Sequence, residues 1–303
     1  MRPATDFVVL ATAGLALAVP LLPCQQGLGA SDAAVQTTPP PRENSDARAQ
    51  YALARRYARG DGVPQDHAKA AECLRKAAEQ GYAPAQNDLG AYYAKGLGVK
   101  QDYTEAAKWY RKAADQGDAL GQYSMGRCCL LGRGLPKDKE AALKWYRQSA
   151  DQNQPEAQCA LGNLFFFGED VKQDCVEAAK WLRKAAEQGY VGAMNNLGFL
   201  YEHGTGVPID IKEAARWYRA GAEKNDPKAQ ANLGIMYDEG TGGLQRDLVE
   251  ALKWFTLSAS QDDPIGKKYQ LDYDRDSRLT EDQVAEARRR ANEFRAALRK
   301  PKP

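Results

Sequence analysis

Histidine is nearly absent from this chain of 303 residues, which contains only His67 and His203. No paired histidine, cysteine or carboxylate residues stand at metal-ligand spacing, and the six cysteines match no zinc pattern. A surplus of one charge is also lacking, because the formal net charge is +2, whereas nucleic-acid-binding domains usually carry a strong basic excess. These absences argue against a metal site, a histidine-based catalytic centre and a nucleic-acid partner.

A phosphate-binding loop is missing as well. Short loops such as Gly204-Thr205-Gly206 look like fragments of one, but they follow an expected helix rather than a strand and lack the Gly-Lys-Ser/Thr continuation. We interpret them as turns. The sequence therefore predicts no catalytic residue, no metal site, no cofactor and no enzymatic activity.

The N-terminus differs in composition from the rest of the chain. An apolar stretch from Phe7 to Leu22 follows one positive charge and precedes small residues, which is typical of a signal peptide and short for a membrane span. We expect residues 1–30 to be a signal peptide, cleaved near Gly29 or Ala30, or an uncleaved N-terminal anchor. Residues 31–46, rich in Thr and Pro, are expected to form a flexible linker.

This N-terminal pattern predicts an exported protein that is periplasmic, envelope-associated or secreted. Leu21-Leu22-Pro23-Cys24 is similar to a bacterial lipoprotein box, although the proline departs from the usual small residue. Lipidation at Cys24 is an alternative to cleavage, and membrane tethering is expected only through this segment. Five cysteines remain beyond it, which leaves room for one or two disulfides, but most are expected to be small core residues.

The remaining chain is dominated by an internal repeat. Six units recur in register from Ala47 to Asp263, each 36 residues long except for one extra residue in the last. In each unit two apolar helical patterns are separated by a glycine-containing loop. The sequence predicts an all-α, right-handed α/α superhelix, or solenoid, of about six helix pairs, with no sheet.

The helix boundaries have local causes. Asp102 precedes Glu105 by three residues, as an N-cap does in a capping box, and this pair recurs in later units. In the first five units the second helix ends at Gly or Asn, the residues that tolerate the left-handed conformation. Gly90 and its equivalents stand inside the first helix, where glycine costs about 1 kcal/mol relative to alanine. We interpret this as a close approach of two helices. The recurring tryptophans of the second helices are expected to be core residues: Trp109, Trp145, Trp181, Trp217 and Trp254.

The repeat resembles the Sel1-like repeat family, a relative of the tetratricopeptide repeats with a longer inter-helix loop. Its motif is A-x-A-Q-x-x-L-G-x-x-Y, then G-x-G-V-x-x-D, then A-x-x-W-Y-x-x-A-A-x-x-G, and the second unit supplies every position. The first unit departs at Cys73-Leu74, which replaces Trp-Tyr, and the fourth at Asp170, which replaces the second loop glycine. Residues 264–303 are expected to hold a partial repeat and one amphipathic capping helix with an apolar stripe at Val284, Ala287, Ala291, Phe294 and Leu298.

The resemblance implies a non-catalytic scaffold that binds a protein or peptide on the concave face, which the first helices line. In the central units apolar and amide side chains occupy the positions left after Leu, Gly and Tyr pack the core. An alternative is an exported binder or hydrolase acting on a small cell-wall-type ligand. A second alternative is that Phe166 or Phe167 packs against its neighbours instead of facing a groove. The predicted groove residues are Tyr123, Leu131, Asn163, Phe166, Phe167, Asn195, Asn196, Phe199 and Asn232.

Overall fold

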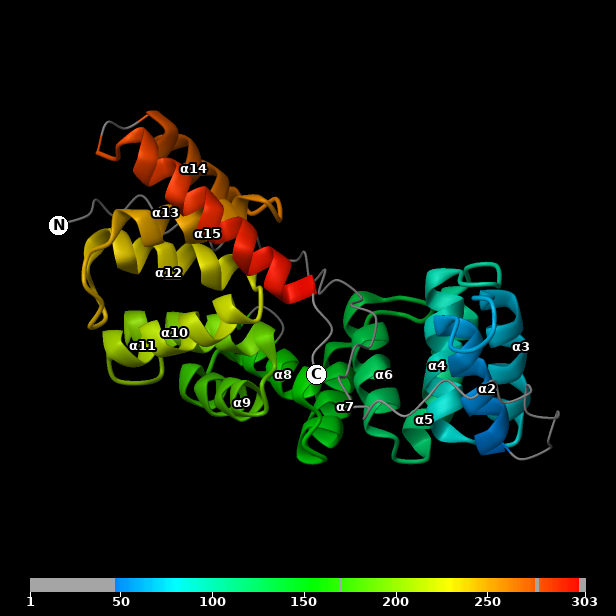
Figure 1. Ribbon diagram of the computed structural model, residues 1–303. Coiled ribbons are helices and arrows are strands. Elements are labelled where there is room, and N and C mark those ends of the chain that lie inside the picture. Colours follow the sequence, from blue (N-terminus) through cyan, green and yellow to red (C-terminus); the bar gives the residue numbers. More distant parts are fainter. Residues whose placement is uncertain (1–46, 169–170, 276–277, 300–303) are drawn as a thin grey trace. The chain divides into compact units, whose positions relative to one another are not determined.

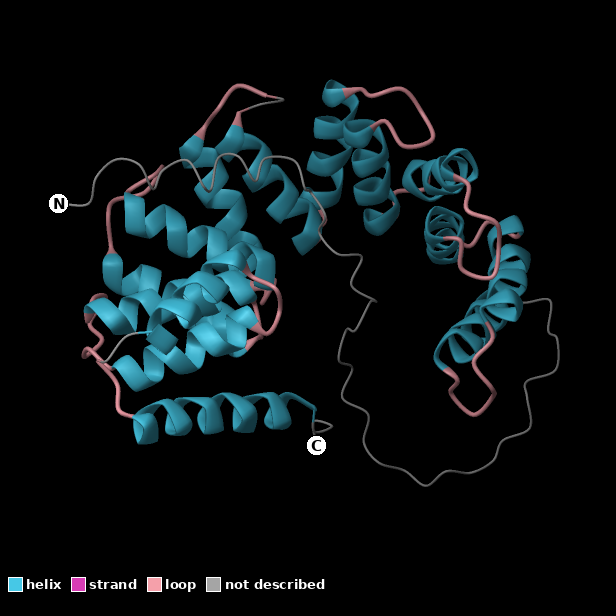
Figure 2. Ribbon diagram, turned by 90° about the horizontal axis from the view of Figure 1, so that it is seen from above, coloured by secondary structure: helices cyan, strands magenta, loops and turns pink. Residues whose placement is uncertain are grey.

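The computed structural model describes residues 47–168, 171–275 and 278–299. Within these ranges the chain forms fourteen α-helices and no strand (Figures 1 and 2). The first twelve helices make six pairs, one pair to each predicted unit, which confirms the all-α solenoid; the handedness of its superhelix stays a prediction. The pairs are α2 (Ala47–Arg59) with α3 (His67–Glu79), α4 (Ala83–Lys95) with α5 (Tyr103–Asp115), α6 (Ala119–Leu131) with α7 (Lys139–Asp151), α8 (Pro155–Phe167) with α9 (Cys175–Glu187), α10 (Val191–His203) with α11 (Ile211–Glu223), and α12 (Pro227–Glu239) with α13 (Leu248–Ala259).

Two further helices follow, α14 (Pro264–Arg275) and α15 (Glu281–Arg299). Consecutive helices from α2 to α14 pack against one another, which is the contact pattern of a solenoid. The predicted signal segment 1–30, with Cys24, and the predicted linker 31–46 lie outside the described residues, as does Asp170. Among the helices that the structure describes, none is long and apolar enough to cross a membrane.

In every repeat after the first, a glycine of the first helix lies directly against an aromatic or leucine side chain of the second helix. A Cβ atom added to Gly90 would lie 2.7 Å from the Tyr110 ring, closer than real Cβ contacts come. In the first unit Ala54 and Leu74 occupy the same two positions, and both residues are buried. The predicted close approach is therefore confirmed, and it recurs as Gly126 with Tyr146, Gly162 with Leu182, Gly198 with Tyr218, and Gly234 with Phe255.

In each of the last five repeats a tryptophan stands just before the second-helix residue that contacts the glycine. The assignment of these tryptophans to the core is only partly right. Trp217 and Trp254 are buried, whereas Trp109, Trp145 and Trp181 are half-buried. Adjacent residues on a helix point about 100° apart. When the tyrosine points at the glycine, the tryptophan before it therefore points toward the edge of the helix pair. Cations cover the exposed ring faces: Lys112 Nζ lies 3.8 Å from the Trp109 ring centroid and Lys184 Nζ lies 4.2 Å from that of Trp181.

The second helices begin as predicted, but with half of a capping box. The Asp102 carboxylate accepts from the Glu105 amide at 3.0 Å. The Glu105 carboxylate does not return the bond, because the Asp102 amide already donates to the Tyr93 carbonyl at 3.0 Å. Glu105 instead pairs with Lys108 at 2.6 Å. Later units repeat this arrangement with Asp174, Asp210 and Asp247 as caps.

Left-handed residues end the second helices, as the Gly and Asn pattern predicts. Gly81, Gly117 and Gly189 have φ between 85° and 87°, and Asn153 and Asn225 have φ of 63° and 68°. Asp262, at 65°, ends the last unit in the same way. Since Asn and Asp tolerate this conformation better than other residues with a Cβ, the chain can vary this position without losing the turn.

Helices α14 and α15 cover the last repeat. Ala287 and Ala291 are fully buried, and Phe294 packs edge-on against Trp254 with ring centroids 5.4 Å apart. Val284 also packs on the core, whereas Leu298 is 45% exposed, so the predicted stripe is confirmed except at its end. Helix α15 starts with a complete capping box, in which Thr280 and Gln283 each accept from the other's amide.

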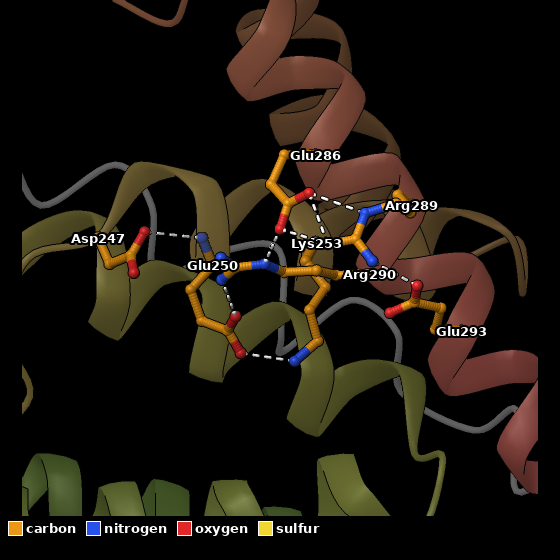
Figure 3. Close-up of polar contacts among 7 residues, drawn as sticks. All are labelled: Asp247, Glu250, Lys253, Glu286, Arg289, Arg290 and Glu293. Atoms are coloured by element: carbon orange, nitrogen blue, oxygen red, sulfur yellow. Dashed lines mark hydrogen bonds and ion pairs between the residues drawn. The ribbon is translucent and has the colours of Figure 1, made fainter.

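Ion pairs fasten the cap (Figure 3). Arg290 bonds Glu286 on its own helix at 2.7 Å and reaches Glu250 of α13 at 3.4 Å, while Arg289 joins Glu286 and Glu293. Hydrogen bonds from Arg290 and Arg289 hold the pKa of the Glu286 carboxyl below its usual range. Arg289 and Arg290 belong to a run of three arginines, Arg288 to Arg290, and both are engaged within the cap.

Candidate functional site

The two histidines stand in separate surroundings. His67 lies at the start of α3 beside the Tyr92 ring, with ring centroids 6.0 Å apart. His203 ends α10; its Nδ1 lies 3.0 Å from the Phe199 carbonyl oxygen, and its ring stacks on the Phe199 ring at 4.1 Å. In the part of the chain that the structure describes, no group of three or more His, Cys, Asp or Glu residues is arranged to hold a metal ion.

The five cysteines between residues 73 and 175 are free thiols in the structure, so none of the one or two disulfides that the sequence allows is formed among them. Cys73, Cys128, Cys129 and Cys159 are buried, and Cys175 is partly exposed. Burial raises the pKa of the Cys128 thiol to about 11 and that of Cys159 to about 12. Thiols with raised pKa values are poor nucleophiles near neutral pH, so these residues are core side chains, as predicted for most of them.

Side chains of successive first helices meet along one side of the repeats. We call this side the first-helix face. It comprises the side chains of α2, α4, α6, α8, α10 and α12 that lie outside the helix-pair cores. Two sets of hydrogen bonds run along it. Tyr51 donates to Asp88 at 2.8 Å, and Ser124 of the third repeat bonds Asn87 of the second at 3.0 Å. The second set links the fourth, fifth and sixth repeats through asparagines.

The predicted groove asparagines are the members of this second set. Asn196 donates to Asn163 at 2.8 Å, and Asn232 donates to Asn195 at 2.9 Å. Asn195 is 8% exposed, and its amide also donates to Asn196 at 3.3 Å. The amides therefore bond one another across the repeats. Whether they face a bound peptide stays a prediction, and each has already used part of its hydrogen-bonding capacity within the chain.

An aromatic cluster occupies the middle of the first-helix face. It consists of Phe166, Phe167, Phe199 and His203. Phe166 packs edge-on against Phe167 and Phe199, with ring centroids 5.0 Å and 5.9 Å away. Phe166 and Phe199 also pack on the core between the fourth and fifth repeats, whereas Phe167 is 50% exposed. Of the two adjacent phenylalanines, Phe166 therefore packs inward and Phe167 faces outward.

Tyr123 and Leu131 take different places. Tyr123 is 9% exposed and its ring packs against Tyr146 at 5.7 Å, so it is a core residue and not a groove residue. The equivalent residues Asn87, Cys159 and Asn195 are buried as well, so this position belongs to the packed side of the first helices. Burial raises the pKa of Tyr123 to about 12. Leu131, the last residue of α6, is half-exposed and belongs to the third repeat, which precedes the repeat that contains Phe166 and Phe167.

Sequence reasoning missed the buried glutamines that join each repeat to the one before it. Gln86 donates to the Ala78 carbonyl of the preceding second helix at 3.0 Å and accepts from Gln116 at 2.6 Å. Gln158 does the same with Ala150 and Gln188. The signal was the recurrence of Gln inside an apolar pattern, which requires a buried hydrogen-bond partner. It also missed His203 as a member of the aromatic cluster.

Comparisons with known proteins agree with this architecture. Residues 47–82, 83–118, 119–154, 155–190, 191–226 and 227–263 each match the Sel1 repeat. The chain is similar to a protective antigen of uropathogenic Escherichia coli that displays an SLR fold, with 36% identity and a TM-score of 0.68 over 82% of this chain and 54% of the other. It thus spans about half of that protein. A Sel1 repeat protein from Oxalobacter formigenes is 33% identical, with a TM-score of 0.65 over 71% of this chain and 85% of the other. No curated protein matches the chain.

Proposed function

Because the chain belongs to the Sel1 repeat family, we propose that it is a non-catalytic scaffold whose first-helix face binds a protein or an extended peptide. Sel1 repeats generally act as scaffolds in protein–protein interactions. The observation that carries the proposal is the exposed ring of Phe167 at the edge of the aromatic cluster, since an aromatic side chain held in place by its neighbours is a favourable binding anchor.

The asparagine chain supports the same use of the face. Asn163 and Asn196, which bond each other at 2.8 Å, are only partly buried, so each amide keeps hydrogen-bonding capacity toward solvent. Hydrogen bonds between amides also hold the side chains in one orientation before a ligand arrives. Ordering them in advance lowers the entropic cost of binding a peptide backbone.

The proposed scaffold works outside the cytoplasm, exported by the segment at 1–30 and carried on the linker at 31–46. The apolar stretch from Phe7 to Leu22, followed by small residues, supports this part of the proposal. Fractionation of cells that express the full chain tests it. Recovery of the protein with the periplasmic, envelope or secreted fraction is expected, and recovery only with the cytoplasm would contradict export.

Site-specific crosslinking tests the binding face. A photo-crosslinking phenylalanine analogue is introduced into the full chain at residue 167, in cells of the natural host. The matched control carries the analogue at Val176, which is 54% exposed but lies on the second helix α9. A discrete protein adduct from residue 167, without one from residue 176, is the expected result. No adduct at 167, or the same adducts at both positions, contradicts the proposal.

A further inference from the structure

The last residues of the six first helices form a column whose chemistry changes along the solenoid. Arg59 and Lys95 end the first two, Leu131 and Phe167 the next two, His203 the fifth and Glu239 the sixth. Because the repeats keep one register, these residues occupy equivalent places in neighbouring units. The column therefore runs from cationic, through apolar and aromatic, to acidic.

Helix stability alone does not explain this order. Cations near a helix C-terminus offset the negative end of the helix dipole, which accounts for Arg59 and Lys95. The same effect would favour cations at the ends of all six helices, yet an apolar residue ends α6 and α8, and Glu239 ends α12. The stability of the individual helices therefore does not account for the residues found along the column.

More positive charge lies beside the apolar part of the column. Arg127, one turn before Leu131, lies over the Tyr123 ring at 5.8 Å, and Arg133, in the following loop, lies over the Tyr103 ring at 5.5 Å. Among residues 47–168, 171–275 and 278–299, neither arginine, nor Arg59 or Lys95, forms an ion pair with a carboxylate. The Tyr123 side chain takes up part of the hydrogen-bonding capacity of the Arg127 guanidinium, but a guanidinium has five donors, so Arg127 and Arg133 both keep donors for another partner.

The acidic end of the face is different, because its carboxylates are engaged within the chain. Glu202 accepts from the Tyr218 hydroxyl at 2.7 Å, and Asp238 pairs with Arg246 at 3.8 Å and Arg278 at 3.4 Å. Positive charge on the first three repeats is therefore available to a ligand, while negative charge on the last three is largely satisfied. A ligand that complements this face carries acidic groups at one end.

We propose, resting on the peptide-binding function above, that the ligand is an extended peptide segment with acidic side chains beside an aromatic or aliphatic anchor. The anchor packs on Phe167 and the aromatic cluster. The acidic side chains lie toward the third, second and first repeats, where Arg133, Arg127, Lys95 and Arg59 receive them. A nucleic acid fits less well, because its phosphates would continue past the apolar part of the column toward Glu239.

Selection from a library of random linear peptides displayed on phage tests the chemistry of the ligand. The bait is the full chain, and the control bait carries Phe167→Ser. Peptides bound by the first but not the second are expected to be enriched in Asp and Glu on one side of a Phe, Trp or Leu. Binding of the most enriched peptide is then measured by fluorescence anisotropy, with a single-stranded oligonucleotide as competitor.

Charge variants show whether the arginines receive the acidic side chains. Arg127→Gln with Arg133→Gln should weaken the selected peptide by about tenfold, the size expected for two exposed ion pairs. The corresponding Lys substitutions, which keep the charge, should restore much of the affinity. Lys144→Gln, an exposed cation on α7, should leave binding unchanged. Raising NaCl from about 50 mM to about 300 mM should also weaken binding, through screening.

The failures separate the two proposals. Peptides that need Phe167 but show no acidic enrichment, or bind the double Gln variant equally well, overturn the inference and leave the peptide-binding function standing. Displacement of the peptide by the oligonucleotide at comparable concentration overturns the inference in favour of a nucleic acid. If no peptide distinguishes the protein from Phe167→Ser, the peptide-binding function fails and the inference fails with it.

Discussion

The two helices of each repeat differ in how much they vary along the chain. The second helices repeat nearly the same residues: an Asp cap, paired alanines and a large residue against the glycine. The first helices keep mainly Ala, Gln, Leu and Gly on their buried side, with exceptions at Ala54 and Met194, and the remaining positions change from Arg to Asn to Phe between units. The second helices are therefore specialised for stability, and the first helices combine stability with a surface that differs from repeat to repeat.

This difference separates two kinds of substitution. A change in the large residues of the second helices should lower stability and affect binding only through unfolding. A change at the exposed positions of the first helices should affect binding and leave stability nearly unaltered. Buried polar residues of the first helices fall between these cases, since they join the repeats without belonging to the apolar core.

The largest effect is expected for Tyr218→Ala. The Tyr218 side chain is fully buried against Gly198, so its removal should lower the free energy of unfolding by about 3–5 kcal/mol. Urea denaturation followed by circular dichroism measures this. Gly198→Ala should be destabilising in the native chain but tolerated in the Tyr218→Ala background, because the clashing ring is gone. If the losses of stability from the two substitutions simply added, contact with the Tyr218 ring would not be the reason for a glycine at position 198.

Gln158→Met should cost about 1–3 kcal/mol, since it leaves the Gln188 amide and the Ala150 carbonyl without their buried partner. Met194 occupies the equivalent position in the fifth repeat, so methionine fits sterically and the cost is one of hydrogen bonding. The same denaturation experiment measures it. Gln148→Met, at an exposed site on α7, serves as the control and should change little. If both substitutions changed the free energy of unfolding equally, the buried hydrogen bonds of Gln158 would not be a source of stability.

Trp181→Ala should cost only about 1–2 kcal/mol, because the ring is half-buried and covered by Lys184. Trp254→Ala, at the equivalent position beneath the capping helix, should cost about 3–5 kcal/mol because that side chain is 4% exposed. Thermal or urea unfolding of the two variants gives the comparison. Similar losses would mean that the tryptophans form one core stripe, as sequence reasoning expected.

The smallest effect concerns Asp88, whose pKa burial raises despite its hydrogen bond from Tyr51. A raised pKa in the folded state means that the folded protein binds this proton more tightly than the unfolded chain. Stability from this group is therefore greatest below the usual value of 3.8 and is lost as the pH rises through the raised value. Asp88→Asn should stabilise the protein modestly at neutral pH and have little effect below pH 3.8. A loss of stability at neutral pH would show that the charge itself is needed.

The repeat period was sufficient to predict the helix pairs, the left-handed helix ends and the glycine contact, because each depends on local backbone geometry or on one neighbouring helix. The choice between Trp109 and Tyr110 as the core residue was not predictable in the same way. Both are large and apolar, they are adjacent, and only the position of Gly90 on the partner helix decides which one points inward.

The candidate site was predictable as a set of positions but not as a set of contacts. Asn163 and Asn196 have donors and acceptors that serve a ligand or each other equally well, and the spacing between repeats decides which. The exposure of Phe167 and the burial of Phe166 also depend on the next repeat. Tyr123 packs against Tyr146 of its own repeat, at a position that is buried in neighbouring repeats as well, which the sequence did not separate from a groove position.

The two sets of hydrogen bonds on the first-helix face have a mechanical consequence. Tyr51 through Ser124 join α2, α4 and α6, and Asn163 through Asn232 join α8, α10 and α12, but within the described residues no side-chain hydrogen bond connects α6 to α8. The joint between the third and fourth repeats, next to the aromatic cluster, therefore lacks a restraint on this face that the other joints have, although the buried Gln158 still bonds the Ala150 carbonyl across it. Bending at this joint would move Phe167 relative to Leu131 without breaking a hydrogen bond on the first-helix face.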